Sequence, residues 1–390
     1  MSEKEREVTT QGARPPVLLS VQALRGLAAL LVLMFHIYEM QRFFLIEHPD
    51  TPAALAGPLL TGFWAQGYVG VDLFFLISGF IMVYITAHQP SGWRTARQFI
   101  WSRFTRIYPL WFLFCTILAV HYFVWPGVPV DETIPGYDGN YPLYLIKSLL
   151  LIPQSAPPIL RLGWTLIHEM FFYFGFTVLL LLPKKFRYVA LPFWGVLTVG
   201  LFALGFSRPS VDGYPALAAS LLTLEFLAGA GIGWLTIKAR FIAPLPCLIL
   251  GGIAAFLAMF TYQDRGADLL LWGRVAVYTL PYALLLYGAM GLEKVWNWQP
   301  PRPAKLLGDW SYSLYLSHLL VLGVLIRTFP VIAARTPDSV AQFFDLGQAG
   351  IIDNLTFILT SFVASLIVAV FFFYAFERPL IRYLRRKRRN

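Results

Sequence analysis

The sequence predicts an all-α polytopic membrane protein of one domain, with about ten transmembrane helices and both termini cytoplasmic. Composition is the first reason, because 57% of the 390 residues are hydrophobic and only 13% are charged, whereas about a quarter of residues in soluble domains are charged. Spacing is the second, because the apolar residues form runs of roughly 20, the length that spans a bilayer. Together these features exclude a soluble globular enzyme.

Ten apolar runs can be drawn, each of helix length and each flanked by polar or Pro- and Gly-containing segments. They cover residues 17–39, 63–86, 107–125, 162–182, 189–206, 216–236, 241–262, 270–292, 306–330 and 353–376. We therefore expect a transmembrane domain over residues 17–377, a disordered cytoplasmic tail over 1–16 and a basic cytoplasmic tail over 378–390. The segment Tyr141–Pro153 is too short to span a bilayer and is expected at the outer face.

Charge sets the orientation of these runs. Lys and Arg follow every even-numbered run and fill the C-terminal tail, whereas acidic residues collect in the loops 40–62, 126–161, 207–215, 263–269 and 331–352. Cytoplasmic loops of membrane proteins are enriched in Lys and Arg. The net charge of +10 is therefore explained by topology, and we expect no nucleic-acid partner. Oligomeric state is not readable, because lipid-facing and protein-facing apolar surfaces look alike.

Ionisable residues inside the runs are the candidates for function, because each is costly in hydrocarbon. In the first run His36 follows Arg25 by eleven residues, three helical turns, so both share one face about 16 Å apart along the axis. Asp72 and Glu169 lie in the outer halves of the second and fourth runs. A carboxylate at the depth of His36 would orient it as a general base. The alternatives are a neutral structural histidine and an Asp72 that hydrogen-bonds Ser78 or nearby backbone.

Two further patterns are a pair of arginines before the third run and a polar stripe along the ninth run. Arg103 and Arg106 are three residues apart and so share a helix face at the cytoplasmic mouth, where two guanidinium groups suit a phosphate or pyrophosphate; arginines required only by topology are the alternative. Ser311, Tyr315 and His318 follow helical spacing down one face of the ninth run, and would line a channel or join helices.

Other chemistries find no support in the sequence. It contains no P-loop and no G-x-S-x-G motif, and His168-Glu169 lacks the second histidine of a zinc helix. We predict no metal. Cys115 and Cys247 both lie within apolar runs and are expected to be small apolar fillers.

Five motifs in order resemble the bacterial integral-membrane acyltransferases called acyltransferase family three, and most of all its exopolysaccharide O-acetyltransferases. They are Leu24-Arg-Gly-Leu-Ala-Ala with His36, Gly70-Val-Asp-Leu-Phe-Phe-Leu-Ile-Ser-Gly-Phe80, Arg103-Phe-Thr-Arg106-Ile-Tyr-Pro109, Trp164-Thr-Leu-Ile-His-Glu169 and Ser311-Tyr-Ser-Leu-Tyr-Leu-Ser-His318. The resemblance implies transfer of an acetyl group from cytoplasmic acetyl-CoA to a sugar hydroxyl of an extracytoplasmic or lipid-linked glycan, in the bacterial inner membrane.

The resemblance also implies roles for residues. His36 matches the family's essential histidine, Arg25 its partner, and Arg103 and Arg106 the arginines associated with the CoA donor. We accordingly expect His36, Glu169 and Asp72 to be catalytic. Acyl-CoA is expected to contact Arg25, Arg103, Arg106, Ser311, Tyr315 and His318, and the acceptor to contact Trp164. Direct attack and an acetyl-histidine intermediate both remain open. The alternative function is a transporter or flippase of a lipid-linked glycan, in which buried carboxylates and histidines serve proton coupling.

Overall fold

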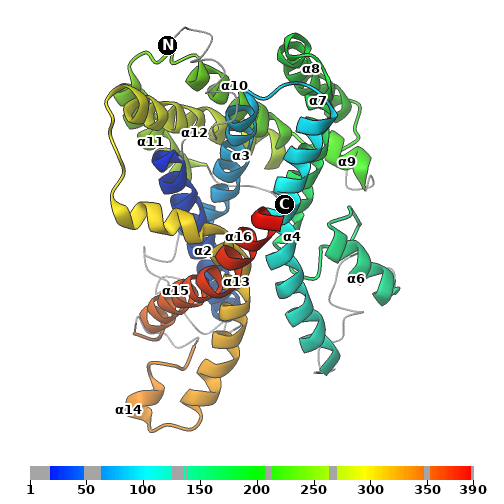
Figure 1. Cartoon of the computed structure of the whole chain (residues 1–390). Helices are drawn as coiled ribbons and strands as arrows, with labels where there is room; N and C mark the ends of the chain where they lie inside the picture. Colours follow the sequence, from blue (N-terminus) through cyan, green and yellow to red (C-terminus); the bar gives the residue numbers. More distant parts are fainter. Residues whose placement is uncertain are drawn as a thin grey trace. The chain divides into compact units, whose positions relative to one another are not determined.

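A computed structural model of the chain describes residues 18–47, 63–124, 136–137, 139–207, 213–262, 270–346 and 352–387. Its regular elements there are all helices, which confirms the predicted fold class (Figure 1). The elements are α2 (Leu19–Glu47), η2 (Trp64–Val69), α3 (Gly70–Thr86), α4 (Trp93–Val124), α6 (Tyr141–Leu150), α7 (Gly163–Leu181), α8 (Lys184–Ala203), α9 (Tyr214–Ala218), α10 (Thr223–Ile237), α11 (Pro244–Thr261), α12 (Leu270–Val295), α13 (Arg302–Ala333), α14 (Asp338–Ala341), α15 (Ile352–Phe372), η3 (Phe373–Glu377) and α16 (Arg378–Lys387). The predicted tail 1–16, much of the predicted acidic loops and residues 388–390 lie outside the described ranges.

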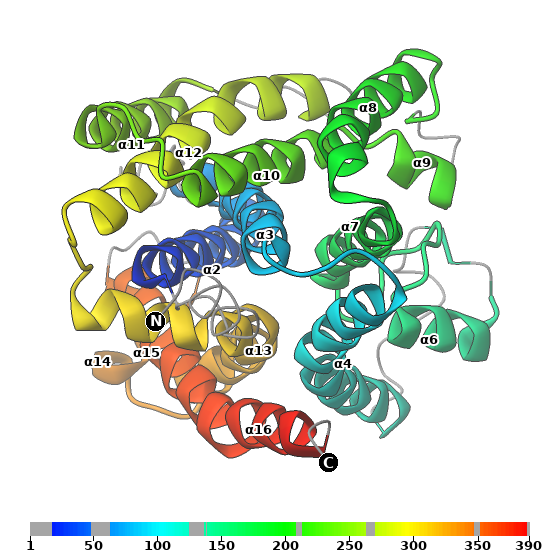
Figure 2. The same cartoon turned by 45° about the horizontal axis from the view of Figure 1, so that its top comes forward.

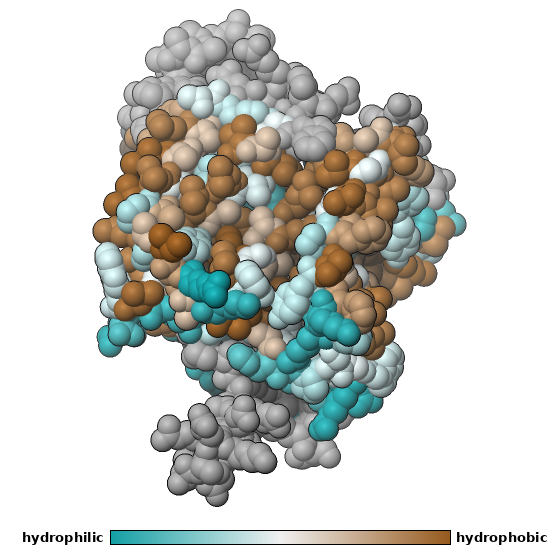
Figure 3. Space-filling model, turned by 90° about the horizontal axis from the view of Figure 1, so that it is seen from above, coloured by the Kyte–Doolittle hydropathy of each residue, from teal (hydrophilic) through white to brown (hydrophobic). Residues whose placement is uncertain are grey.

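Nine helices of the described ranges are long and apolar enough to cross a membrane, and they correspond to nine of the ten predicted runs. Large apolar side chains project outward from them: Val178, Val196 and Ile367 are each at least 60% exposed. Figure 3 shows hydrophobic residues over much of one face. Soluble monomers rarely expose apolar surface on this scale, so the chain is a multi-pass integral membrane protein.

The sixth predicted run differs from the expectation. Residues 216–236 do not form one helix, because the helix is interrupted at residues 219–222 and the run is divided between α9 and α10. At 15 residues, α10 is about 22 Å long, short of the ~30 Å hydrocarbon thickness. Its first turn contains the fully buried Glu225, so the helix begins inside the protein.

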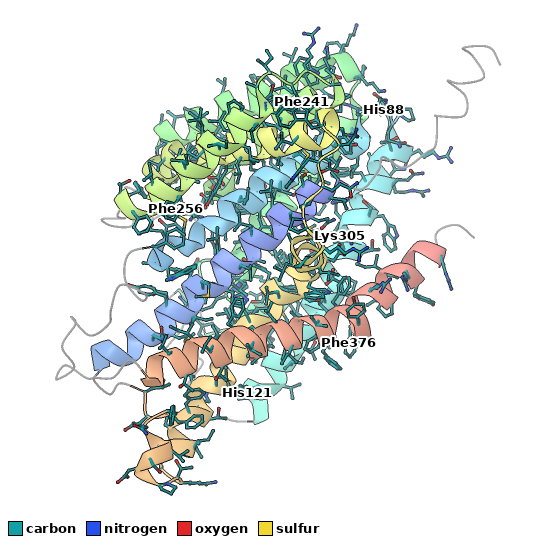
Figure 4. The ribbon with its side chains drawn as sticks, turned by 90° about the vertical axis from the view of Figure 1, so that its left-hand side faces the viewer. His88, His121, Phe241, Phe256, Lys305 and Phe376 are labelled. Atoms are coloured by element: carbon teal, nitrogen blue, oxygen red, sulfur yellow. The ribbon has the colours of Figure 1, made fainter. Side chains whose placement is uncertain are left out.

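Two helix boundaries also differ. The third run was predicted to begin at residue 107, but α4 begins at Trp93, because Phe99, Trp101 and Phe104 continue the aromatic content of the helix between its basic residues. At the other end of the chain, α15 continues through the π-helical η3 into α16, and Figure 4 shows this bent helix with Phe376 labelled. The predicted basic tail thus begins as a helix.

The helices form two compact units. The first unit contains residues 18–21, α3 from Asp72, α4, α6 to α10, α11 as far as Gly252, and α12. The second unit contains α2 from Gln22, η2, the end of α11 from Ile253, and α13 to α16.

Aromatic stacking and close backbone contacts form the core of the first unit. The Phe172 ring stacks on Trp194 and Phe226 at centroid distances of 4.7 and 4.2 Å. Figure 2 shows α10 beside α12. A Cβ on Gly229 of α10 would lie 1.8 Å from the carbonyl oxygen of Leu76 in α3, so the two backbones touch, as small residues allow in membrane proteins.

In the second unit α13 packs along α15 (Figures 1 and 2). The Phe329 ring of α13 meets Phe357 of α15 edge to face at 5.4 Å. Near the other end, the Ser313 hydroxyl donates a 2.6 Å hydrogen bond to the carboxylate of Glu377 in η3. Glu377 is buried, and this bond provides it with a polar partner there.

Candidate active site

A pair of histidines lies in the second unit. Nδ1 of His36 on α2 is 2.9 Å from the carbonyl oxygen of Val32 and 3.1 Å from Nε2 of His318 on α13. Nδ1 of His318 is in turn 2.9 Å from the carbonyl oxygen of Leu314. His318 is only 1% exposed, whereas His36 is partly exposed. The structure thus brings together two residues that the sequence separates by 282 positions.

Glycines explain why the two rings meet. Gly26 of α2 and Gly308 of α13 lie at a helix crossing, where a Cβ on Gly308 would come within 1.9 Å of the carbonyl oxygen of Gln22. His36 follows Gly26 by ten residues, and His318 follows Gly308 by ten residues. The two helices therefore run in the same direction from the crossing to the histidine pair, as expected for odd-numbered spans one and nine.

The other candidates of this unit lie on the same two helices. Arg25 is partly buried next to the crossing, and its Nη1 donates a 3.1 Å hydrogen bond to Oε1 of Gln22. Ser311 is fully buried and donates to the carbonyl oxygen of Gly308 at 2.8 Å. The Tyr315 ring lies 6.2 Å from the His318 ring, centroid to centroid. The predicted polar stripe of α13 is therefore buried, and His318 at its end contacts His36.

The first unit contains a buried ion pair that the sequence did not reveal. Nε and Nη2 of Arg274 on α12 donate to Oδ1 and Oδ2 of Asp72 on α3 at 2.7 and 2.6 Å. Glu225 of α10 is fully buried and within electrostatic range of both groups. Arg274 lies inside the predicted eighth run, so the criterion that selected Asp72, an ionisable group within a span, would also have selected Arg274.

A second cluster of this unit contains Glu169. Its carboxylate accepts a 2.9 Å hydrogen bond from the Ser78 hydroxyl and a short one from the Tyr173 hydroxyl. Ser78 therefore contacts Glu169, and the alternative in which it bonds Asp72 finds no support. The guanidinium carbon of Arg103 lies 5.6 Å from the centroids of both Tyr173 and Phe99. Tyr173 thus connects the predicted CoA-binding Arg103 with the predicted catalytic Glu169.

The helix that contains Arg103 begins earlier than the predicted run, at Trp93. Helices α4 and α7 are antiparallel: the N–H of Gly92, just before α4, donates to Leu180 near one end of α7, and Trp111 packs on Gly163 at its other end. Arg103 meets Tyr173, halfway along α7. Arg103 and Arg106 therefore lie within a helix of membrane-spanning length, Trp93–His121, and not before it.

Trp164, the predicted acceptor contact, is in the first turn of α7 and is 36% exposed. Its ring meets Phe75 and His168 edge to face, at 6.5 and 5.7 Å. Nδ1 of His168 faces the carbonyl oxygen of Trp164 at 2.9 Å, which fixes the first turn. No three His, Cys, Asp or Glu side chains in the described ranges are grouped as metal ligands.

Comparison with known proteins identifies the family. The model of an acyltransferase domain, acyltransferase family three, matches residues 18–374. The chain is 30% identical over 289 residues to the exopolysaccharide production protein ExoZ of Rhizobium meliloti (strain 1021), covering 70% of this chain and 81% of that protein. It is 27% identical over 337 residues to the acyltransferase MdmB of Streptomyces mycarofaciens, covering 79% and 80%. No solved structure matches.

The family model spans α2 to the start of η3, and so includes the histidine pair, the Asp72–Arg274 ion pair and the Glu169 cluster. The chain therefore belongs to acyltransferase family three and is a membrane acyltransferase.

Proposed function

We propose that this protein transfers an acetyl group from cytoplasmic acetyl-CoA to a sugar hydroxyl of an extracytoplasmic polysaccharide or its lipid-linked precursor. The family supports acyl transfer, and the name of ExoZ supports a link to exopolysaccharide. The basic loops after the even-numbered predicted runs support cytoplasmic termini, and the bacterial relative ExoZ supports a location in the inner membrane.

The observation that carries the proposal is the hydrogen bonding of His36. A carbonyl oxygen only accepts, so the ring nitrogen that faces Val32 at 2.9 Å bears the proton. In the neutral ring the basic lone pair is then on Nε2. This tautomer lets His36 act as a general base with a defined atom, which is what deprotonation of a sugar hydroxyl requires.

Arginines support an anionic donor. Stacking on the rings of Phe99 and Tyr173 holds the guanidinium of Arg103 by its face, which leaves N–H groups at its edge for phosphate oxygens. Arg106 lies one turn further along α4, and Arg25 begins the α2 face that leads to His36. An extended pantetheine arm would cover the ~16 Å along that face, from Arg25 to His36.

In the direct reaction the sugar oxygen attacks the thioester carbonyl carbon and its proton moves to Nε2 of His36. The tetrahedral intermediate then expels CoA as a thiolate, which takes the proton and restores the neutral histidine. In the acyl-enzyme alternative Nε2 first receives the acetyl group and CoA leaves before the acceptor binds. Glu169, held by Ser78 and Tyr173, would bind the acceptor hydroxyl, and Trp164 would stack on the sugar.

Acetyl transfer by purified protein tests the proposal, with radiolabelled acetyl-CoA as donor and chemically de-O-acetylated surface polysaccharide of the host as acceptor. His36→Ala should retain CoA binding and lose transfer. His88→Ala, at an exposed histidine before α4 (Figure 4), should retain both and is the matched control. Transfer by His36→Ala would remove His36 from the chemistry, and a wild-type protein that binds no CoA would favour the transporter alternative.

A further inference from the structure

We propose that His318 is the positioning residue of the reaction: together with the carbonyl oxygen of Val32 it accepts the hydrogen on Nδ1 of His36, which holds the ring in place and keeps its basic lone pair on Nε2. This inference rests on the proposed function, since it assumes that His36 is the base. It gives His318 a role different from the acyl-CoA contact that the sequence suggests.

The protons of the pair follow from its acceptors. Nδ1 of His318 faces the carbonyl oxygen of Leu314 at 2.9 Å, so this nitrogen bears the hydrogen and Nε2 of the neutral ring is an acceptor. Nδ1 of His36 also bears a hydrogen, because it faces Val32. The one hydrogen on Nδ1 of His36 is therefore shared between the carbonyl oxygen of Val32 at 2.9 Å and Nε2 of His318 at 3.1 Å, and His318 accepts only when it is neutral.

This arrangement does what a carboxylate does for the histidine of a catalytic triad, without a second charge in the membrane. When Nε2 of His36 takes the proton of the sugar, the ring becomes an imidazolium and its Nδ1–H becomes a stronger donor. A neutral acceptor that is already in place then stabilises the charged ring and prevents its rotation. His318 is 1% exposed and its own second nitrogen is bound by Leu314, so its orientation is maintained before substrate arrives.

The surrounding packing supports positioning. His318 and His36 each lie ten residues beyond the Gly26–Gly308 crossing, where the two backbones touch. The separation of the rings is therefore set by a backbone contact, and does not depend on a flexible side chain. A positioning residue such as His318 must hold the base, His36, in a precise place.

Two substitutions separate the contact with His36 from the local contact with Leu314. In His318→Gln the terminal amide oxygen falls near the position of Nε2 and accepts from His36. In His318→Asn the shorter amide falls near Nδ1, so it donates to Leu314 and does not reach His36. We expect His318→Asn to lower kcat about 10- to 100-fold with an unchanged KM for acetyl-CoA, because a hydrogen bond to a charged group is lost. We expect His318→Gln to retain most of the activity.

A measurement on His36 itself completes the test. The chain has six histidines, so ¹⁵N spectra of histidine-labelled protein are tractable, and the signals absent from His36→Ala identify His36. We expect the Nδ1–H tautomer in wild type and His318→Gln, and a larger share of the Nε2–H tautomer in His318→Asn, where Val32 is the one remaining acceptor of the pair. An Nε2–H tautomer in wild type, equal activity of the Asn and Gln variants, or a raised KM for acetyl-CoA with unchanged kcat would each overturn the inference. An active His36→Ala would instead overturn the proposed function.

Discussion

The crossing of α2 and α13 gives the sharpest test of how packing positions the histidine pair. In Gly308→Ala the new Cβ would lie 1.9 Å from the carbonyl oxygen of Gln22, whereas ordinary contact begins at 3.4 Å. Because the obstructing atom belongs to the backbone, α2 and α13 must separate by about 1.5 Å, the difference between these distances. If the displacement persists to the histidines, their 3.1 Å contact opens beyond hydrogen-bond range.

Gly323→Ala on the same helix is the matched control. Its Cβ would meet only a guanidinium nitrogen of Arg327, at an ordinary 3.5 Å. Both variants gain the same helix propensity, about 1 kcal/mol. The difference between their free energies of unfolding therefore isolates overpacking at the crossing, which we expect to cost about 1–3 kcal/mol.

The assay is thermal unfolding of detergent-solubilised protein by tryptophan fluorescence, together with acetyl transfer. Gly308→Ala should unfold at a lower temperature than Gly323→Ala and lose about 10- to 100-fold in kcat. Equal unfolding temperatures would refute the close crossing. A destabilised Gly308→Ala with wild-type kcat would show that the crossing does not position the histidines.

Two further predictions concern the first unit. Arg274→Met leaves the buried Asp72 carboxylate without its bidentate partner, so it should lower the free energy of unfolding by about 3–5 kcal/mol. The double variant Arg274→Met with Asp72→Leu should recover much of that loss in chemical unfolding. A double variant as unstable as Arg274→Met would argue against a direct pair. Tyr173→Phe keeps the ring under Arg103 and removes the donor to Glu169. It should raise KM for the acceptor more than KM for acetyl-CoA in steady-state kinetics, and the reverse pattern would place Glu169 on the donor side.

Much of the fold was predictable because hydrocarbon imposes a strong pattern on sequence. A membrane span needs about 20 apolar residues, and nine of the ten predicted runs are helices of that kind. The exceptions have local causes. The sixth run is divided at residues 219–222, and its second helix, α10, has the buried Glu225 in its first turn. The third begins early because Arg103 lies within an aromatic helix and stacks on rings, whereas hydropathy counts an arginine as the end of a span.

The candidate residues were predictable as members of a set, because an ionisable group in a membrane is costly and so is selected by position alone. His36, Asp72, Glu169 and His318 all satisfied that criterion. Their partners were not predictable, because apolar helices carry no pairwise signal that shows which faces meet.

The sequence by itself therefore determined the membrane class, the helical architecture and the short set of ionisable residues that are costly inside a membrane span. Tertiary structure alone decided how they pair across helices: His36 with His318, Asp72 with Arg274, and Glu169 with Ser78. The physical reason is distance. These pairs join helices far apart in the chain, and the backbone contacts that bring them together, such as Gly308 against Gln22, exist only once the helices have packed.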